Sequence, residues 1–294
     1  MNQNPCVIGV DVGGSSINLS VVLNGQIQEK LSILTPANRP ESEVIAAIIQ
    51  GIESIMEGYT IEGIGMGVPG LVDEEKGIVY QVTNIPSWQE VHLVDQITNY
   101  FGIETYITND ANCYVLGEKY YGKGQQLENI VGITLGTGLG VGMVIHNKLH
   151  SGVLSCAGEL AVVPYLNRNY EHFCSGQFFE KEFGVKGSEL FEMARAGDVK
   201  AIEIYQQYGG HLGNLIKLVL HLLSPQGIYF GGSIQHAFPF FKESMFNVLS
   251  SFPYRRVLDS VEIAASGKEN MALLGAAALF MMRKYDGLAE LNKA

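Results

Sequence analysis

The sequence predicts an α/β protein of two related lobes that face each other. Each half of the chain begins with apolar, β-branched strands that carry a glycine-rich turn, at 11–16 and at 136–142. Helical and strand-like patterns then alternate in both halves. With 294 residues, 47% of them hydrophobic, the chain can bury a substantial core. No linker separates the halves, so the boundary near Ala111 rests on the repeat.

The first half predicts three strands, a helix, a strand, a helix and a last strand. Asn24-Gly25 divides two β-like runs and is typical of a tight hairpin turn. Apolar residues recur at helical spacing after Pro40, which favours a helix there. The elements with defined limits are expected at 6–10, 17–23, 26–32, 42–56, 64–68 and 105–108.

The second half repeats this theme. A second hairpin, a long apolar helix, a strand, a last strand and a last helix are expected at 130–135 with 141–146, 200–223, 227–230, 261–265 and from 271 onward. The long helix is apolar enough to serve as core, as an interface between subunits, or as both. A shorter helix is expected to begin near Gly176.

Three features of the first half fall where predicted strands end, namely Asp11, Pro69-Gly70 and Asp110. In open α/β sheets, ligands bind outside the carboxyl ends of the strands. These residues are therefore expected on one rim, as part of a binding site.

The two glycine-rich turns, Asp11-Val-Gly-Gly-Ser-Ser16 and Gly136-Thr-Gly-Leu-Gly-Val-Gly142, are suited to phosphate. Glycine lets backbone N–H groups approach phosphate oxygens, and Ser15, Ser16 and Thr137 add hydroxyl donors. Neither turn has the spacing of a P-loop or of a dinucleotide site, and the second turn is followed by a strand where a dinucleotide site would begin a helix. Taken alone, each turn is a weak indication of phosphate binding.

Composition excludes several classes of protein. The net charge is −11 and Lys and Arg do not cluster, which argues against a nucleic-acid partner. No apolar run reaches the ~18–20 residues of a membrane span. The N-terminus lacks the features of a secretion signal, and four scattered cysteines are typical of reduced thiols. We therefore expect a cytoplasmic protein without a membrane segment.

Several motifs occur together in the order found in one family. They are Asp11-Val-Gly-Gly-Ser15, Thr83-Asn-Ile-Pro-Ser-Trp88, Asn109-Asp-Ala-Asn112, Leu135–Met143 followed by Gly158-Glu159, and Gly231-Gly232. With these motifs the chain resembles a sugar kinase of the ROK family (repressors, open reading frames and kinases) over nearly its whole length. The resemblance implies the two-lobed actin-like ATPase (ribonuclease H-like) fold, with a cleft between the lobes.

The resemblance also implies a division of labour between the lobes. Residues 1–111 would form a small, sugar-side lobe, and residues 112–280 a larger lobe with the nucleotide and oligomer surfaces. A C-terminal helix at 281–294 can pack back on the first lobe. By analogy with the family, a homodimer or a tetramer is expected.

The reaction implied by the resemblance is transfer of the γ-phosphoryl group of MgATP to a hexose hydroxyl, O6 of glucose or of a related hexose. Asp110 would be the general base, and Asp11 would hold Mg²⁺ through water. The sugar would be bound by Gly70, Asn84, Asn109, Glu159 and Glu182. The residues expected around ATP are Asp11, Gly13, Gly14, Ser15, Ser16, Gly136, Thr137, Gly138, Gly231 and Gly232.

Each of these side chains also has a purely structural interpretation. Asp110 could be only the N-cap of a helix at 111–119, and Asn84 only a turn former. Glu182 could be a solvated residue of the helix that begins near Gly176, and Trp88 could simply pack its loop. The sequence alone does not separate these interpretations from the functional ones.

The chain departs from the family pattern at the usual zinc motif. Val162 stands where the family has a histidine, and the three cysteines of the motif are absent if Glu182 fixes the alignment. Tetrahedral zinc needs such ligands, so we predict no structural zinc. Loss of the histidine also removes a sugar contact. Ser15 replaces a threonine and Asn18 a frequent lysine, which weakens the phosphate side.

Three classes of function remain open. The first is a hexose kinase, either glucokinase-like or acting on N-acetylmannosamine or N-acetylglucosamine. A transcriptional repressor of the family is disfavoured, because only ten residues precede Asp11 and a DNA-binding segment would be needed there. A catalytically weak sugar-binding regulatory protein is the third class, suggested by Val162 and by the altered first turn.

Overall fold

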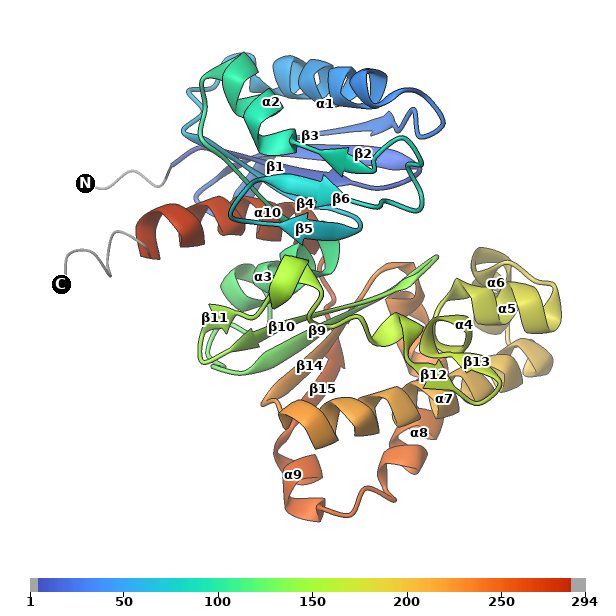
Figure 1. Cartoon of the computed structure of the whole chain (residues 1–294). Helices are drawn as coiled ribbons and strands as arrows, with labels where there is room; N and C mark the ends of the chain where they lie inside the picture. The colour runs from blue at the N-terminus through green and yellow to red at the C-terminus, as the bar shows by residue number, and fades with distance from the viewer. Residues whose placement is uncertain (1–4, 287–294) are drawn as a thin grey trace.

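The first lobe is built on a five-stranded sheet, as shown by a computed structural model that describes residues 5–286 (Figure 1). The strand order is β3-β2-β1-β4-β8, in which β1 pairs antiparallel with β2 and parallel with β4. The strands are β1 (Val7–Val12), β2 (Ser16–Leu23), β3 (Gln26–Leu34), β4 (Gly63–Val68) and β8 (Thr105–Asn109). Helices α1 (Glu41–Met56) and α2 (Leu93–Phe101) share one hydrophobic core with this sheet.

The second lobe repeats the same sheet. Its strand order is β11-β10-β9-β14-β15, with β9 antiparallel to β10 and parallel to β14. The strands are β9 (Ile130–Leu135), β10 (Leu139–Ile145), β11 (Lys148–Leu149), β14 (Gly227–Gly231) and β15 (Glu262–Ala265). In each lobe an antiparallel hairpin thus precedes two parallel strands, which confirms the repeat predicted from the two glycine-turned hairpins.

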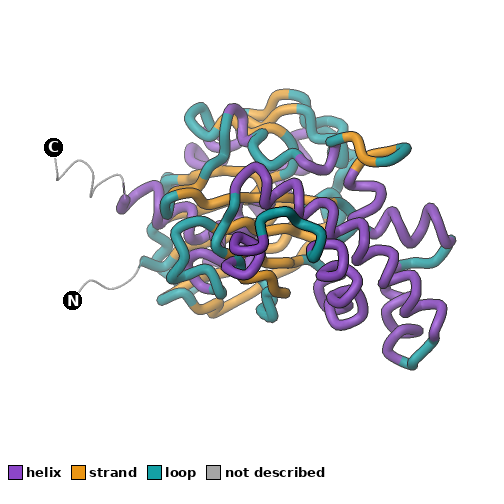
Figure 2. Tube along the Cα trace, turned by 90° about the horizontal axis from the view of Figure 1, so that it is seen from below, coloured by secondary structure: helices purple, strands orange, loops and turns teal. Residues whose placement is uncertain are grey.

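Helices build most of the remaining core of the second lobe. They are α4 (Tyr170–Cys174), α5 (Gly176–Phe183), α6 (Gly187–Arg195), α7 (Val199–Leu223), α8 (Phe238–Leu249) and α9 (Arg255–Ser260). The apolar face of α7 is buried, mainly against α8, and shares one hydrophobic cluster with the sheet, so this helix is a core element. Figure 2 shows the strands in the middle of the molecule and a group of helices extending to one side, which in Figure 1 is the side of α5, α6 and α7.

Short elements complete the chain. A small antiparallel sheet consists of β5 (Leu71–Asp73), β6 (Ile78–Tyr80) and β7 (Glu90–Val91), and β12 (Pro164–Tyr165) pairs with β13 (Arg168–Asn169). Four further short helical segments are η1 (Val153–Ser155), η2 (Leu160–Val162), η3 (Ser233–Ala237) and η4 (Met282–Asp286). The small sheet was not predicted, because strands of two or three residues carry too little sequence pattern.

Two helices, α3 (Asp110–Tyr121) and α10 (Met271–Met281), cross each other between the two sheets (Figure 1). Their backbones approach so closely that a Cβ on Gly275 would lie 1.6 Å from the carbonyl oxygen of Cys113. In the same crossing, a Cβ on Gly117 would lie 2.1 Å from the carbonyl oxygen of Met271. Glycine at both positions is therefore what allows the crossing, which joins the lobes.

The helix that packs on the first sheet is α10, which contacts β1 and β4. The sequence analysis gave that role to a helix at 281–294, of which residues 287–294 lie outside the described part of the chain. Within the described residues, Lys284 pairs with Glu104 of the first lobe at 3.1 Å. The lobe limits at 111/112 and 280/281 stay a prediction.

Candidate functional site

Asp110 stands at the junction of β8 and α3. The helix cap is the preceding residue, Asn109, which has an extended backbone and whose side-chain oxygen accepts a hydrogen bond from the Ala111 amide at 2.9 Å. Asp110 Oδ1 also accepts from that amide, at 2.8 Å. The capping role considered for Asp110 therefore belongs to Asn109, and Asp110 is the first residue of the helix.

The carboxyl of Asp110 opens onto solvent in the space between the lobes, yet it lies deep among protein atoms. Loss of hydration at this depth raises its pKa from 3.8 to about 7, with smaller contributions from the charges of Asp11 and Glu159. The Ala111 amide acts in the opposite direction. A carboxyl with a pKa near neutrality can accept a proton under ordinary conditions, which is what a general base requires.

A central cavity of about 680 Å³ lies at this junction and is lined by both lobes. From the first lobe it is lined by Gly70 and Asn84, and Asn109 and Asp110 lie at its floor. The amide nitrogen of Asn109 donates to the carbonyl oxygen of Gly70 at 3.3 Å, which ties β8 to the loop after β4. Two glycines, Gly136 and Gly138, also line it, and its further polar lining residues are Gln81, Thr83, Thr134, Thr137, Glu159, Glu171 and Gln177.

A second cavity of about 400 Å³ adjoins the first. Asp110, Thr134 and Gly232 line both cavities. The second one also contains Asp11, whose pKa is raised by loss of hydration and is lowered in part by a hydrogen bond from Asn18. Its other lining residues include Tyr114, Ser233, Gln235, His236, Lys268, Glu269 and Asn270. Asp110 therefore stands where two cavities meet.

The first glycine turn is less open than the sequence predicted. The Gly13 amide donates to the Ser16 carbonyl at 2.8 Å, so it is already used within the turn. Gly14 packs on Asn84, and a Cβ on Gly14 would lie 2.6 Å from the Asn84 Cβ. Gly13, Gly14, Ser15 and Ser16 are absent from the lining of both cavities. In the described structure, Asp11 is the residue of this turn that reaches the site.

The second glycine turn lies at the central cavity. Gly136, Thr137 and Gly138 all line it. The Gly136 amide donates to the Gly138 carbonyl at 3.1 Å, which again uses one amide within the turn. The two glycines at the end of β14 have different surroundings. Gly231 is buried against the ring of Tyr114, whereas Gly232 lines both cavities.

Glu182 does not join the other predicted sugar-binding residues. Its carboxylate pairs with Nε2 of His172 at 2.6 Å, and it is absent from the lining of the central cavity. Glu171 lines the cavity, opposite Gly138. The pKa of Glu159 is raised by loss of hydration and, to a smaller extent, by the charge of Glu171. Glu171 was not singled out from the sequence, because the alignment with the family motif was fixed on Glu182.

The described residues, 5–286, hold no group of three or more His, Cys, Asp or Glu side chains that could bind a metal ion. All four cysteines are free thiols, and only Cys156 is exposed. Val162 lines the central cavity with 65% of its surface exposed. No helix in this part of the chain is both long and apolar enough to cross a membrane.

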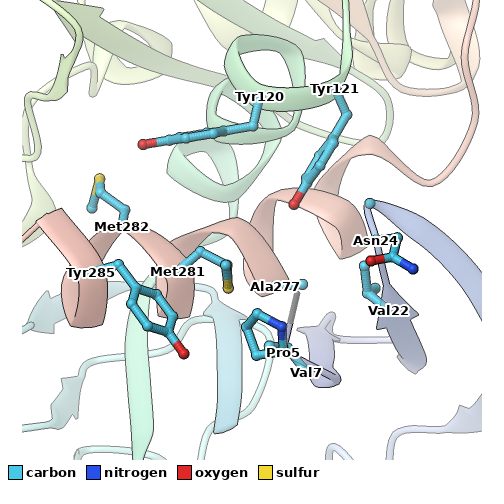
Figure 3. Close-up of a pocket in the computed structure, with 11 residues that line it drawn as sticks. Pro5, Val7, Val22, Asn24, Tyr120, Tyr121, Ala277, Met281, Met282 and Tyr285 are labelled. Carbon is cyan, nitrogen blue, oxygen red and sulfur yellow. The ribbon is translucent and has the colours of Figure 1, made fainter. Parts of the chain in front are cut away.

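A separate apolar cavity of about 320 Å³ lies between α3, α10 and the first sheet (Figure 3). Tyr120, Tyr121, Met281, Met282 and Tyr285 surround it. It shares no lining residue with the two cavities at Asp110, and its walls hold no carboxylate. This cavity is therefore distinct from the two that meet at Asp110.

Comparison with known proteins gives a consistent result. The chain is 28% identical to a glucokinase of Thermotoga maritima, over 94% of this chain and 98% of that protein. It is also 28% identical to a xylose repressor of Bacillus subtilis, over 91% of this chain and 75% of that protein. The structure superimposes on a ROK family glucokinase from Streptomyces griseus, solved with glucose and AMPPNP, with a TM-score of 0.81 and 25% identity, over 93% of this chain and 98% of that one.

The paired five-stranded sheets are those of the actin-like ATPase fold, as expected. The model of the ROK family matches residues 7–283, which is nearly the whole described chain. The repeated sheets, the junction at Asp110 and this match lead to one conclusion: the chain is a member of the ROK family.

Proposed function

We propose that this protein is an ATP-dependent sugar kinase that transfers the γ-phosphoryl group of MgATP to a hexose hydroxyl, O6 of glucose or of a closely related hexose. The observation that carries the proposal is the place of Asp110. Its carboxyl, with a pKa of about 7, stands where a polar cavity built by both lobes meets a second cavity containing Asp11. Similarity to glucokinases over nearly the full chain supports the same reaction.

In this proposal Asp110 accepts the proton of the attacking hydroxyl. Phosphoryl transfer is catalysed mainly by positioning and by charge stabilisation, and a base contributes by about 10²–10⁴ in rate. Asp110 is fixed for this role because it begins α3 immediately after the Asn109 cap. The hydroxyl would enter from the central cavity, and the phosphoryl group would arrive across the shared wall formed with Thr134 and Gly232.

We place the sugar in the central cavity. A polyol needs fixed donors and acceptors around its ring, and Asn84, Asn109 and Glu159 line this space, as does Gly70. Glu171 takes the role that the sequence analysis gave to Glu182, because Glu171 lines the cavity and Glu182 is held by His172.

We place the polyphosphate of ATP near Gly136, Thr137, Gly138 and Gly232. Asp11 would hold Mg²⁺, and this residue fits the ion, because a carboxylate that has lost hydration faces the second cavity there. Magnesium is bound in proteins by one or two carboxylates with waters and phosphate oxygens. When bound, it neutralises charge that develops on the transferred group. A homodimer or tetramer and a cytoplasmic location stay predictions.

Phosphorus NMR spectroscopy tests this proposal directly. The purified protein is incubated with MgATP and glucose, and the expected result is a new sugar-phosphate resonance whose coupling pattern assigns the phosphorylated position. An inactive Asp110→Asn variant serves as the control for contaminating kinases. Consumption of ATP without any sugar-phosphate signal would contradict the proposal.

Two other functions have a specific observation in their favour. An N-acylhexosamine kinase is favoured by the exposed Val162 side chain at the cavity, which offers an apolar contact to an acetamido methyl group. A sugar-binding regulatory protein is favoured by the similarity to a xylose repressor and by the occupied Gly13 amide. Calorimetric titration with MgATP distinguishes the regulatory protein from a kinase. A regulator without catalysis has no need of a nucleotide site and is expected not to bind MgATP.

A further inference from the structure

Glu74 is a buried carboxylate that lies outside the cavities at Asp110. It follows β5 of the small sheet, and only 8% of its side chain is exposed. A buried carboxylate requires donors for its oxygens or a positive partner. Glu74 has both, and they come from three separate parts of the chain.

Four side chains donate to the two oxygens of Glu74. Oε1 accepts from the hydroxyl of Thr108 and, at 2.9 Å, from the hydroxyl of Ser155. Oε2 accepts from the hydroxyl of Ser151 at 3.2 Å and from the guanidinium of Arg283. Every interaction is with an uncharged hydroxyl or a cation, so the charge of Glu74 is fully compensated.

The first group of donors belongs to the segment that carries the base. Thr108 lies on β8, two residues before Asp110. Its hydroxyl oxygen also accepts a hydrogen bond from the side-chain amide of Asn112 at 3.1 Å, on the first turn of α3. Both Thr108 and Asn112 are almost completely buried. Glu74 is thereby linked to the residues on either side of Asp110.

The second group of donors belongs to the loop of the second lobe that carries Glu159. Ser151 and Ser155 lie on this loop, which leads through Gly158 to Glu159 at the central cavity. Leu154 and Ser155 have positive φ angles of 52° and 53°, a conformation that residues with a side chain seldom adopt. Such a conformation persists only where surrounding contacts hold it, and the bond from Ser155 to Glu74 is one of them.

We propose that Glu74 is a positioning residue that fixes the loop of residues 151–159 to the strand that ends at the base, and so sets the place of Glu159 relative to Asp110. This inference rests on the proposed function, in which these two carboxylates serve the sugar. Arg283 completes the arrangement, since its guanidinium pairs with Glu74 and brings the segment after α10 to the same point.

The test compares Glu74→Gln with a matched control. Glutamine keeps the size of the side chain and removes its charge and one acceptor. Lys284→Ala is the control, because Lys284 neighbours Arg283 and forms an ion pair with Glu104 that involves neither Glu74 nor the loop. Ser155→Ala is the milder second variant, which removes one hydroxyl and leaves the Glu74–Arg283 pair in place.

Hydrogen exchange of the ligand-free proteins gives the first readout. We expect amides of residues 151–159 to exchange at least about tenfold faster in Glu74→Gln and in Ser155→Ala, and to be unchanged in Lys284→Ala. A variant that carries both Glu74→Gln and Ser155→Ala should exchange no faster than Glu74→Gln alone, because both substitutions remove the same hydrogen bond. Unchanged exchange in both single variants, or an equal increase in Lys284→Ala, would overturn the proposal.

Kinetics give the second readout. We expect KM for the sugar to rise by about tenfold or more in Glu74→Gln, with KM for MgATP changed less than threefold. Equal increases in both constants would indicate a general loss of structure and would overturn the positioning role. If the unaltered protein phosphorylates no sugar, the proposed function fails, whereas the exchange measurement still decides whether Glu74 holds the loop.

Discussion

Asp110 is the residue on which the proposed chemistry depends. Its surroundings give it a pKa of about 7, chiefly through lost hydration and then through the charge of Asp11. Asparagine at this position has nearly the same shape and cannot accept a proton. We expect Asp110→Asn to lower kcat by at least about 10² while sugar and ATP still bind. Steady-state kinetics with calorimetric titration measure this, and retention of more than a tenth of the rate would show that Asp110 is not the base.

The raised pKa of Asp110 predicts the pH dependence of activity. Asp110 accepts a proton only when it is deprotonated, so kcat/KM for the sugar should fall with unit slope as the pH drops below about 7. A profile that stays flat down to pH 5 would mean that the group which limits activity has an ordinary carboxyl pKa. The measurement uses a coupled ADP assay with the coupling enzymes in excess at each pH.

The same pKa predicts a change in stability. Between about pH 4 and pH 7 the folded protein keeps a proton on Asp110 that the unfolded chain has lost, so this group makes stability fall as the pH rises through that range. Asp110→Asn removes the effect. Thermal unfolding should give a higher Tm for the variant than for the unaltered protein at pH 8, and equal values near pH 4; a lower Tm at pH 8 would contradict the assigned pKa.

Two glutamates provide a matched test of the sugar site. Glu171 lines the central cavity, and Glu182 is held outside it by His172. We expect Glu171→Gln to raise KM for the sugar by about tenfold or more, since a charged hydrogen bond is worth about 1.5–3 kcal/mol. Glu182→Gln should change this constant less than threefold. A larger increase of KM in Glu182→Gln than in Glu171→Gln would instead assign sugar binding to Glu182, as the sequence predicted.

At the scale of single elements, the crossing of α3 and α10 depends on glycine. A Cβ at position 275 would lie 1.6 Å from the carbonyl oxygen of Cys113, so the helices would have to move apart. We expect Gly275→Ala to destabilise the protein by about 3 kcal/mol or more. The control is Gly210→Ala on α7, where a Cβ would meet only Val248 at 4.0 Å.

The control substitution has its own expected result. Alanine favours a helix over glycine by about 0.5–1 kcal/mol, so Gly210→Ala should be neutral or stabilising. Urea unfolding of both variants measures the two free energies. Equal stability of Gly275→Ala and the unaltered protein would show that the helices do not cross as closely as described.

Elements with a strong local pattern could be predicted from the sequence. The predicted helix at 42–56 is observed as Glu41–Met56, and the long helix expected at 200–223 as Val199–Leu223. Helices α8 and α9 were not predicted. In α8 the buried residues Phe241, Met245 and Leu249 do recur every four positions, so that signal was present, whereas α9 has only six residues and buries none. The contact between Gly14 and Asn84 could not be predicted either, since it joins residues 70 positions apart in the chain.

At the scale of the whole molecule, the repeat of the two lobes was visible in the sequence, because each sheet begins with a hairpin turned at glycine. Which glutamate faces the cavity was not visible, since Glu171 and Glu182 are distinguished only by how α4 and α5 pack. Links such as that of Glu74 to Ser155 join different lobes and leave no mark in local sequence. The sequence therefore predicted candidate site residues that lie within one motif. It did not predict the side chains from other segments that contact those residues.

The central claim is that two lobes bring a sugar and MgATP together at Asp110. Its most direct test is ADP release from MgATP by the purified protein with glucose, fructose, mannose, glucosamine, N-acetylglucosamine and N-acetylmannosamine in turn. We predict that one of these sugars stimulates release strongly in the unaltered protein and not in Asp110→Asn. No stimulation by any sugar, together with no binding of MgATP, would contradict the claim and leave a sugar-binding regulatory protein.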